Sequence, residues 1–200
     1  MLEQIFTISF LTAFLTAAVR MAVPLIYAGL GETFLERTGI LNIGMEGVML
    51  GGALFSFAGA LLSGSLAVGL VCGMLGGLAV SAIHGFLCIN LSQNQSVSGI
   101  ALNIFMLGLT SFLYKILTAG QSYQDIETIP TMAIPVLSSI PLVGNAFFNQ
   151  DILTYLVYLL VILAVFFYRK TGAGLAFTAV GEHPRAADAA GIPVYKYQWI

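Results

Sequence analysis

Charged side chains are scarce in this chain of 200 residues, because only 8% are Asp, Glu, Lys or Arg. An ordinary soluble domain carries about 25% of such residues. Hydrophobic residues make up 58% of the sequence, and a soluble fold of this composition could not cover its apolar surface. The scarcity of charge therefore excludes an ordinary soluble domain and predicts a protein that lies in lipid.

The sequence also lacks the side-chain sets of common enzymes. It has no nucleotide-binding loop of the G-x-x-x-x-G-K-[ST] type, no convincing Ser/His/Asp or Cys/His set, and no cluster of metal ligands. Cys72 and Cys88 lie in apolar runs and are expected to be reduced packing residues. His84 is expected to be packed or hydrogen-bonded, and His183 lies in the tail. We therefore expect no enzyme activity, and no metal or cofactor bound by this chain.

Long uncharged runs predict an all-α, polytopic bundle of transmembrane helices with broken helices. No charged residue interrupts the sequence from Gly47 to Tyr114, whereas one membrane helix needs about 20 apolar residues. This run predicts about three spans, and Ile152–Tyr168 predicts another. We expect five to six spans in a single domain of residues 1–200, at about 4–31, 42–62, 65–89, 97–117 and 152–168.

The first of these segments allows two interpretations. Arg20 and Pro24 interrupt it, so it is either one kinked span or an interfacial helix that ends near Arg20, followed by a second helix from Met21. Because arginine is costly at mid-membrane but can reach the polar layer from a boundary, the second interpretation is favoured. The run Ile5–Val19 has no basic region before it and no cleavage site after it, so we expect a retained helix rather than a signal peptide.

Small residues are frequent in the second and third segments. Gly69, Gly73 and Gly77 follow one another at four-residue spacing. In water such glycines would weaken a helix, whereas in lipid they let helix backbones approach closely. The spacing therefore fits a tightly packed bundle.

The distribution of basic residues predicts the orientation of the chain. The stretch 118–151 contains Asp125, Glu127 and three prolines but no Lys or Arg. Four of the seven basic residues lie in the tail: Arg169, Lys170, Arg185 and Lys196. The positive-inside rule therefore predicts that loop 118–151 is extracytoplasmic and that the tail 169–198 is cytoplasmic. Because an apolar segment could begin at Trp199, we also expect the protein to be C-terminally truncated.

Glu46 is a carboxylate at the edge of an apolar run, where a charge usually has a partner or a role. If the segment is helical, Asn42 and Glu46 share one face because they are four residues apart. The glycines at positions 39, 44 and 47 indicate an irregular or broken helix start. Glu46 either stabilises a helix N-terminus through the helix dipole or lines a translocation path, as broken helices do in transporters. The two roles are compatible.

Asn103 is a lone carboxamide in the predicted span 97–117. Such a side chain usually forms a hydrogen bond between helices. A position on the wall of a pore is the alternative.

The tail contains a short helix signal within residues 179–198. Pro184 suits the first turn of a helix, and Gly191 suits the position just after its end. The run RAADAA between them favours helix but is too short to be stable alone in water. It therefore needs a partner surface, either as an ordinary interfacial helix or as a docking helix for a cytoplasmic motor subunit.

Three motifs occur in order along the chain: ERTGILNIGMEG at 36–47, SGIALN at 98–103, and a G-x-N/H-P-x-A-A-x-x-A-G-I pattern at 181–192. Together they resemble the branched-chain amino acid, ribose and nucleoside permease superfamily of ABC importers, in its nucleoside or simple-sugar branch. The resemblance assigns an ATPase-coupling helix to Gly181, Glu182, His183, Pro184, Arg185, Ala186, Ala187, Asp188, Ala190 and Gly191.

The resemblance implies a permease subunit of an ATP-driven importer in the bacterial plasma membrane. Two cytoplasmic ATPase subunits would dock on the coupling helix and use the ATP, so that the permease itself hydrolyses nothing. A second permease, identical or related, would complete the pathway, and an extracytoplasmic binding protein or lipoprotein would deliver the solute. No nucleic acid is expected as a partner.

The motif around Glu46 implies nucleosides as the solute, with simple sugars as the alternative. Asn42, Glu46 and Asn103 are then candidates to line the path, since ribose hydroxyls and base edges require polar partners. A competing class is an ion-coupled secondary transporter of small polar solutes, which would have no reason to keep an isolated cytoplasmic helix. A non-transporting membrane scaffold is the second rival.

Overall fold

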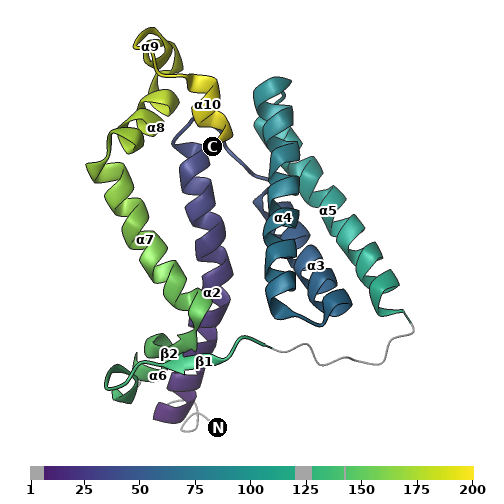
Figure 1. The fold of residues 1–200 in the computed structure, drawn as a ribbon, viewed down its shortest axis with the longest axis vertical. Coiled ribbons are helices and arrows are strands. Elements are labelled where there is room, and N and C mark those ends of the chain that lie inside the picture. Colours follow the sequence, from purple (N-terminus) through teal and green to yellow (C-terminus); the bar gives the residue numbers. More distant parts are fainter. Residues whose placement is uncertain (1–6, 120–127, 142) are drawn as a thin grey trace. The chain divides into compact units, whose positions relative to one another are not determined.

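The computed structural model describes residues 7–119, 128–141 and 143–200, and these residues form mainly helices (Figure 1). This confirms the predicted all-α membrane fold. The long helices are α2 (Ile8–Glu36), α3 (Met45–Ser63), α4 (Leu66–Gly85), α5 (Gln95–Thr118) and α7 (Ile152–Lys170). The short elements are the π-helical turn η1 (Phe86–Asn90), β1 (Thr131–Ala133), the 3₁₀ turn η2 (Leu137–Ser139), α6 (Val143–Phe148), β2 (Asn149–Asp151), α8 (Gly172–Glu182), α9 (Pro184–Ala189) and α10 (Val194–Trp199).

In the described part of the chain, five helices are long and apolar enough to cross a membrane, the lower of the two numbers predicted. The favoured break near Arg20 is wrong, because α2 runs without interruption through Arg20 and Pro24. With 29 residues, α2 is about 43 Å long, which exceeds the roughly 30 Å of the hydrocarbon core. A helix of this length tilts or extends beyond the core, so Arg20 can reach the polar layer without a break.

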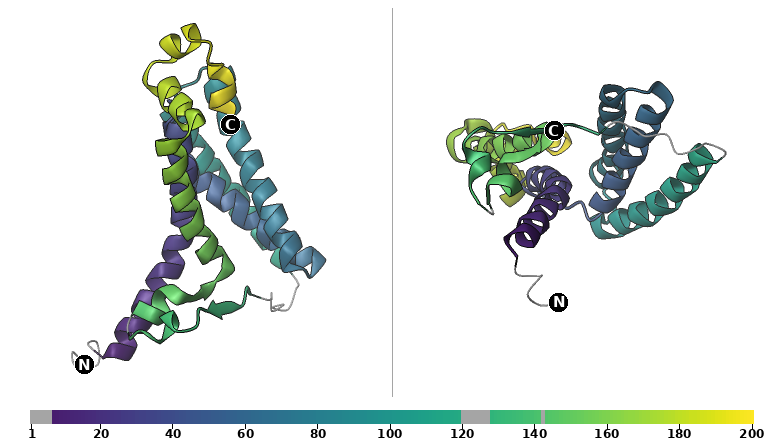
Figure 2. Two further views of the ribbon diagram at one scale, coloured as in Figure 1. Left: turned by 60° about the vertical axis from the view of Figure 1, so that its left-hand side comes forward. Right: turned by 90° about the horizontal axis from the view of Figure 1, so that it is seen from below.

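The chain divides into two compact units, and the first comprises the described part of Met1–Leu30 together with Ile129–Thr171. Within it α7 runs beside α2 (Figure 2), and the Tyr27 hydroxyl donates to the Leu153 carbonyl oxygen at 2.8 Å. At the start of α7, β1 and β2 pair in antiparallel register, with Thr131 opposite Asp151. The predicted loop 118–151 therefore contains ordered short elements, whereas Asp125 and Glu127 lie outside the described residues.

The second unit, Gly31–Thr128 with Gly172–Ile200, contains the bundle of α3, α4 and α5. The predicted small-residue packing is confirmed between α3 and α4. A Cβ added at Gly73 would lie 2.8 Å from Ser56 Cβ and 3.1 Å from the Gly52 carbonyl oxygen. A Cβ at Gly69 would meet Ala60 Cβ at 2.8 Å. The two helix backbones therefore approach closely along a stripe of residues without bulky side chains.

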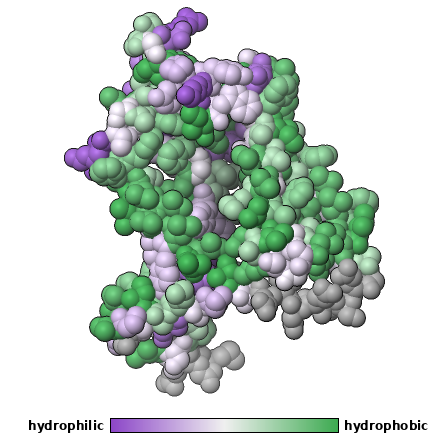
Figure 3. All heavy atoms as spheres, in the orientation of Figure 1, coloured by the Kyte–Doolittle hydropathy of each residue, from purple (hydrophilic) through white to green (hydrophobic). Residues whose placement is uncertain are grey.

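Many large apolar side chains remain exposed on α3, α4, α5 and α7. Figure 3 shows hydrophobic residues covering these helices, whereas hydrophilic residues gather around α9. A surface of this kind suits helices surrounded by lipid, where apolar side chains need no cover. The chain is accordingly a multi-pass membrane protein.

Candidate functional site

The joining segment, residues 37–44, connects α2 to α3 without regular secondary structure. It begins with a Schellman motif, in which the Ile40 N–H donates to the Leu35 carbonyl oxygen and the Gly39 N–H donates to the Glu36 carbonyl oxygen, at 3.2 and 3.0 Å. Gly39 has a φ of +85°, in the left-handed region that residues with a side chain rarely adopt. The irregular helix start predicted from the glycines is therefore confirmed.

Side chains from three helices hold the joining segment in place. Gln95 Oε1 accepts from the Leu41 N–H at 2.8 Å, and Glu32 Oε1 accepts from the Asn42 N–H at 2.7 Å. His84, only 2% exposed, places Nε2 3.4 Å from the Leu41 carbonyl oxygen, which confirms its predicted packed role. These contacts replace the backbone partners that a continuous helix would have supplied.

Asn103 joins α5 to the start of α3. Its Oδ1 accepts from the Gly47 N–H at 2.6 Å, and its Nδ2 donates to the Ile43 carbonyl oxygen at 3.0 Å. The N-cap of α3 is Gly44, which has no side chain to cap the helix. Asn103 therefore supplies from another helix the hydrogen bond that an N-cap side chain normally supplies, and the predicted hydrogen bond between helices is confirmed.

Asn42 and Glu46 lie close in sequence but in different surroundings. Asn42 precedes α3 in the joining segment and is 4% exposed, whereas Glu46 is exposed in the first turn of α3. A shared face was expected only if the segment is helical, and this condition is not met, because the helix begins only at Met45. Glu46 does occupy the end of the helix at which the dipole favours a carboxylate.

Two buried acceptor atoms without a partner lie at the joining segment, one on Asn42 within it and one on Glu32 at the end of α2. In the described part of the chain, Asn42 Oδ1 and Glu32 Oε2 are buried and form no hydrogen bond. Such an unpaired buried group costs about 1–3 kcal/mol. The two atoms are therefore able to accept a hydrogen bond from a donor that enters this part of the bundle.

The last turn of α8 lies directly against the start of the joining segment. A Cβ at Gly181 would lie 2.5 Å from the Arg37 carbonyl oxygen and 3.1 Å from the Gly39 nitrogen. One turn earlier, the Phe177 ring meets the ring of Phe34 edge to face, with ring centroids 6.1 Å apart. The close contact means that the end of α8 cannot move toward α2 without displacing the joining segment.

The short helix α9 has the boundaries that the sequence predicts. Pro184 occupies the first turn, and Gly191 follows the end with a φ of +83°. A second Schellman motif closes the helix, with the Ile192 N–H donating to the Ala187 carbonyl oxygen at 3.0 Å and the Gly191 N–H donating to the Asp188 carbonyl oxygen at 2.9 Å. Of the predicted coupling residues, Ala187 is 4% exposed and Gly181 is half-buried. The exposed ones are Glu182, His183, Pro184, Arg185, Ala186, Asp188, Ala190 and Gly191.

Two side chains that hold the joining segment, Gln95 and Glu32, escaped the sequence analysis. Gln95 lies in the polar turn NLSQNQSVS, and Glu32 lies in a charged linker. From its sequence, each stretch looks like an ordinary loop that connects two helices. The sequence did contain one signal that could have identified them. A glycine-rich irregular segment has backbone groups that need hydrogen-bond partners from elsewhere, and polar side chains such as these can supply them.

Comparison with known proteins places this geometry in a family. The family model described as branched-chain amino acid transport system / permease component matches residues 14–200. A putative glucose ABC transporter permease of Haloferax volcanii is 40% identical over 96% of the chain and 58% of its own length. A nucleoside ABC transporter permease of Lactococcus lactis is 37% identical over 88% of the chain and 58% of its own length.

A guanosine ABC transporter permease of Bacillus subtilis is 36% identical over 96% of the chain and 63% of its own length. The chain thus spans about three-fifths of the length of these relatives. None of the solved structures matches it. The family match over nearly the whole chain shows that this protein belongs to the branched-chain amino acid transport system permease family.

Proposed function

We propose that this chain is the membrane-embedded permease subunit of an ATP-driven importer of nucleosides. The observation that carries the proposal is α9, a short helix whose side chains are exposed except for Ala187. It directly follows α8, and Gly181 in the last turn of α8 contacts the joining segment. An exposed two-turn helix gains little stability from itself and suits a partner protein. Relatives that are ABC transporter permeases support this assignment.

The contact between α8 and the joining segment supplies a route for force. A partner that pulls or tilts α9 also moves the end of α8, since only His183 separates the two helices. Because Gly181 lies against the backbone of Arg37 and Gly39, this motion displaces the joining segment. The joining segment in turn holds the start of α3 through Asn103, so the displacement reaches the membrane-spanning bundle.

Nucleosides are the solute that the relatives support best, because two of them carry nucleoside or guanosine in their names. The glucose permease relative keeps simple sugars as the alternative. Asn42 and Glu46 are the candidates for direct solute contact, since one has an unpaired buried oxygen and the other is exposed. Asn103 contributes to the path by positioning α3, because both ends of its carboxamide already bind backbone groups.

The partners follow from this assignment. Two cytoplasmic ATPase subunits would bind and hydrolyse ATP, and this chain would neither bind a cofactor nor catalyse a reaction. A second permease, identical or related, would form the other half of the pathway. An extracytoplasmic binding protein or lipoprotein would present the solute at the face where α7 begins, opposite the basic tail.

The test is co-purification of the ATPase with permease variants in which α9 carries a new charge. Ala186→Glu and Ala190→Glu place a carboxylate on exposed positions of this region, so the fold is retained while the docking surface changes. We expect both variants to reach the membrane in normal amounts, to lose the ATPase, and to lose nucleoside uptake. Ala119→Glu, exposed at the residue that follows α5, is the control. Normal ATPase binding and uptake by both α9 variants would falsify the proposal.

A further inference from the structure

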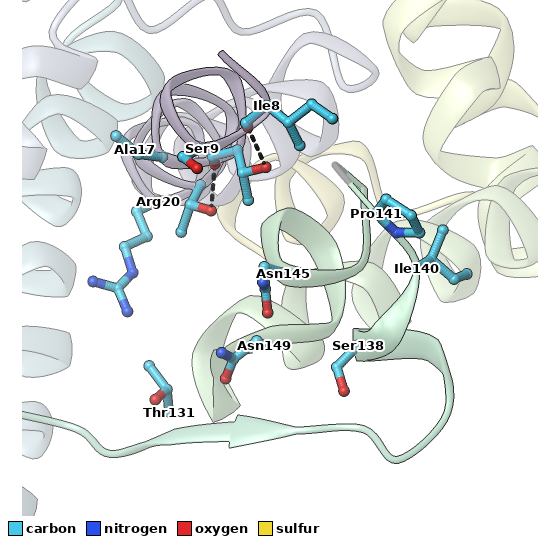
Figure 4. A pocket seen from close by; sticks show the side chains of 13 residues that line it. Ile8, Ser9, Ala17, Arg20, Thr131, Ser138, Ile140, Pro141, Asn145 and Asn149 are labelled. Carbon is cyan, nitrogen blue, oxygen red and sulfur yellow. Dashed lines mark hydrogen bonds between the residues drawn. The ribbon is translucent and has the colours of Figure 1, made fainter.

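A groove in the first unit lies between α2 and the residues that surround the β1–β2 pair. It has a volume of about 820 Å³. Figure 4 shows α2 on one side and the segment from Thr131 to Asn149 on the other. Apart from Ile8 at one end, the α2 wall consists of small or polar residues at helical spacing, with Arg20 at the other end: Ser9, Thr12, Ala13, Thr16, Ala17 and Arg20. The opposite wall consists of Thr131, Ser138, Ile140, Pro141, Asn145 and Asn149.

A buried glutamine fixes the position of the Arg20 guanidinium. Arg20 Nε donates to Gln150 Oε1 at 3.3 Å, and Gln150 is 0% exposed. Gln150 is itself held, because its Nε2 donates to the Ala146 carbonyl oxygen at 2.6 Å and its N–H donates to the Tyr155 hydroxyl at 3.2 Å. The terminal N–H groups of Arg20 therefore stay available on the side of the groove where Thr131 and Asn149 lie (Figure 4).

The polar groups of the groove offer both donors and acceptors. The Thr12 and Thr16 hydroxyls donate to backbone carbonyls within α2, each at 2.8 Å, so their lone pairs remain as acceptors. Among the described residues, the carboxamides of Asn145 and Asn149 have no hydrogen-bond partner. Each carboxamide can donate and accept. A ligand rich in hydroxyl groups can satisfy such a mixture, since each hydroxyl also does both.

The groove changes character along its length. Arg20, Thr131 and Asn149 form a polar end, whereas Ile140 and Pro141 form an apolar wall at the other side (Figure 4). Ile8 and Arg20 are twelve residues apart on one helix, which corresponds to roughly 18 Å. A free sugar would fill the polar end and leave the apolar wall uncovered. A molecule with a hydroxyl-rich part and a flat, less polar part matches both ends.

We propose that this groove is a nucleoside-binding site at the extracytoplasmic face, in which Arg20 and Asn149 hold the ribose hydroxyls and the base lies against Ile140 and Pro141. The site is separate from the joining segment, because its lining residues belong to the other unit. It rests on the proposed import of nucleosides, and it adds a place where the solute is held before it enters the membrane-spanning path.

The experiment compares two substitutions at adjacent positions of α2. Ala17→Phe fills the groove while leaving its polar groups in place, whereas Ala18→Phe adds the same ring at an exposed position outside the lining. The complete transporter in lipid nanodiscs is titrated with guanosine, ribose, glucose and ribose 5-phosphate by calorimetry. We expect guanosine to bind most tightly, Ala17→Phe to abolish its binding, and Ala18→Phe to leave its Kd within twofold.

Two further variants guard against a simple failure to fold. Arg20→Met and Asn145→Ala each remove polar groups from the groove. We expect guanosine to bind at least tenfold more weakly to Arg20→Met and about threefold more weakly to Asn145→Ala. Each variant is first checked for normal assembly by gel filtration. Unchanged guanosine affinity in all assembled groove variants overturns the site, and so does preferential binding of ribose 5-phosphate, which would indicate an anion site.

The result also separates this site from the proposed function. If the wild-type transporter imports guanosine while all assembled groove variants keep full guanosine affinity, the groove assignment fails and the importer assignment stands. If the groove variants lose guanosine binding but the wild-type complex shows no ATP-dependent uptake, the site stands and the importer assignment fails.

Discussion

The α3–α4 interface and the joining segment lie in the same unit but are held together by different forces. At the interface, Gly69 and Gly73 bring two helix backbones into direct contact with almost no polar side chains involved. In the joining segment, residues 37–44, the backbone departs from helix and depends on side chains such as Gln95 and Asn103. One region is stabilised by close packing, the other by individual hydrogen bonds.

This difference indicates which region is suited to move. Close packing over a whole interface is costly to rearrange, because any shift loses many contacts at once. A segment held by separate hydrogen bonds can exchange them singly, and each contributes only about 0.5–1.5 kcal/mol net. The α3–α4 pair is therefore expected to move as one body, and the joining segment is expected to change shape when the tail moves.

The largest effect is expected from Gly73→Leu in the α3–α4 interface. The new side chain would collide with Ser56 and the Gly52 backbone, and overpacking of this kind costs about 3 kcal/mol. We expect a large loss of monodisperse protein and a clear fall in the temperature of thermal unfolding. Gly108→Leu is the control, because a Cβ at that glycine meets no atom within 4 Å. Equal behaviour of the two variants would mean that the interface is not close-packed.

A smaller, local effect is expected from Asn103→Ala. The change removes the hydrogen bonds to Gly47 and Ile43, which should cost about 1 kcal/mol in a membrane protein. Hydrogen exchange measured by mass spectrometry should become faster in the first turn of α3 and remain unchanged in α4. Ser111→Ala, whose hydroxyl bonds only within α5, should leave exchange in α3 unaltered. Protection that stays the same in Asn103→Ala would contradict the capping role.

The smallest effect on stability is expected from Glu46→Gln. Glu46 is exposed, and a carboxylate at a helix N-terminus contributes about 0.3–1 kcal/mol. If Glu46 also contacts the solute, uptake should fall several-fold while the assembled complex and its unfolding temperature hardly change. Radiolabelled guanosine uptake into proteoliposomes measures this. Uptake equal to that of the wild type would remove Glu46 from the path.

The spans could be predicted from sequence because they depend on composition. Uncharged runs locate α3, α4, α5 and α7 to within a few residues, and the helix boundaries at Pro184 and Gly191 follow from local backbone preferences. The continuity of α2 could not be predicted, because Arg20 is accommodated by Gln150, a residue 130 positions away. Tertiary contact overrode the local cost of the charge.

The site was less accessible to sequence analysis. The hydrogen-bonding role of Asn103 followed from the general behaviour of amides in membranes, but its partners Gly47 and Ile43 did not. The shared face of Asn42 and Glu46 assumed helical periodicity where Gly39 and Gly44 had already ended it. Periodicity is informative only inside regular elements, so the partners of an irregular segment emerge only from the fold.

The contact between Gly181 and the joining segment is tested most directly by the smallest possible side chain. Gly181→Ala places a methyl group against the Arg37 backbone, whereas Gly172→Ala, at the start of α8, meets no atom within 4 Å. Both variants are reconstituted with the ATPase, and guanosine uptake is measured per molecule of ATP hydrolysed. The account predicts normal ATPase binding in both and an uptake ratio at least tenfold lower in Gly181→Ala alone. Equal ratios in the two variants would contradict it.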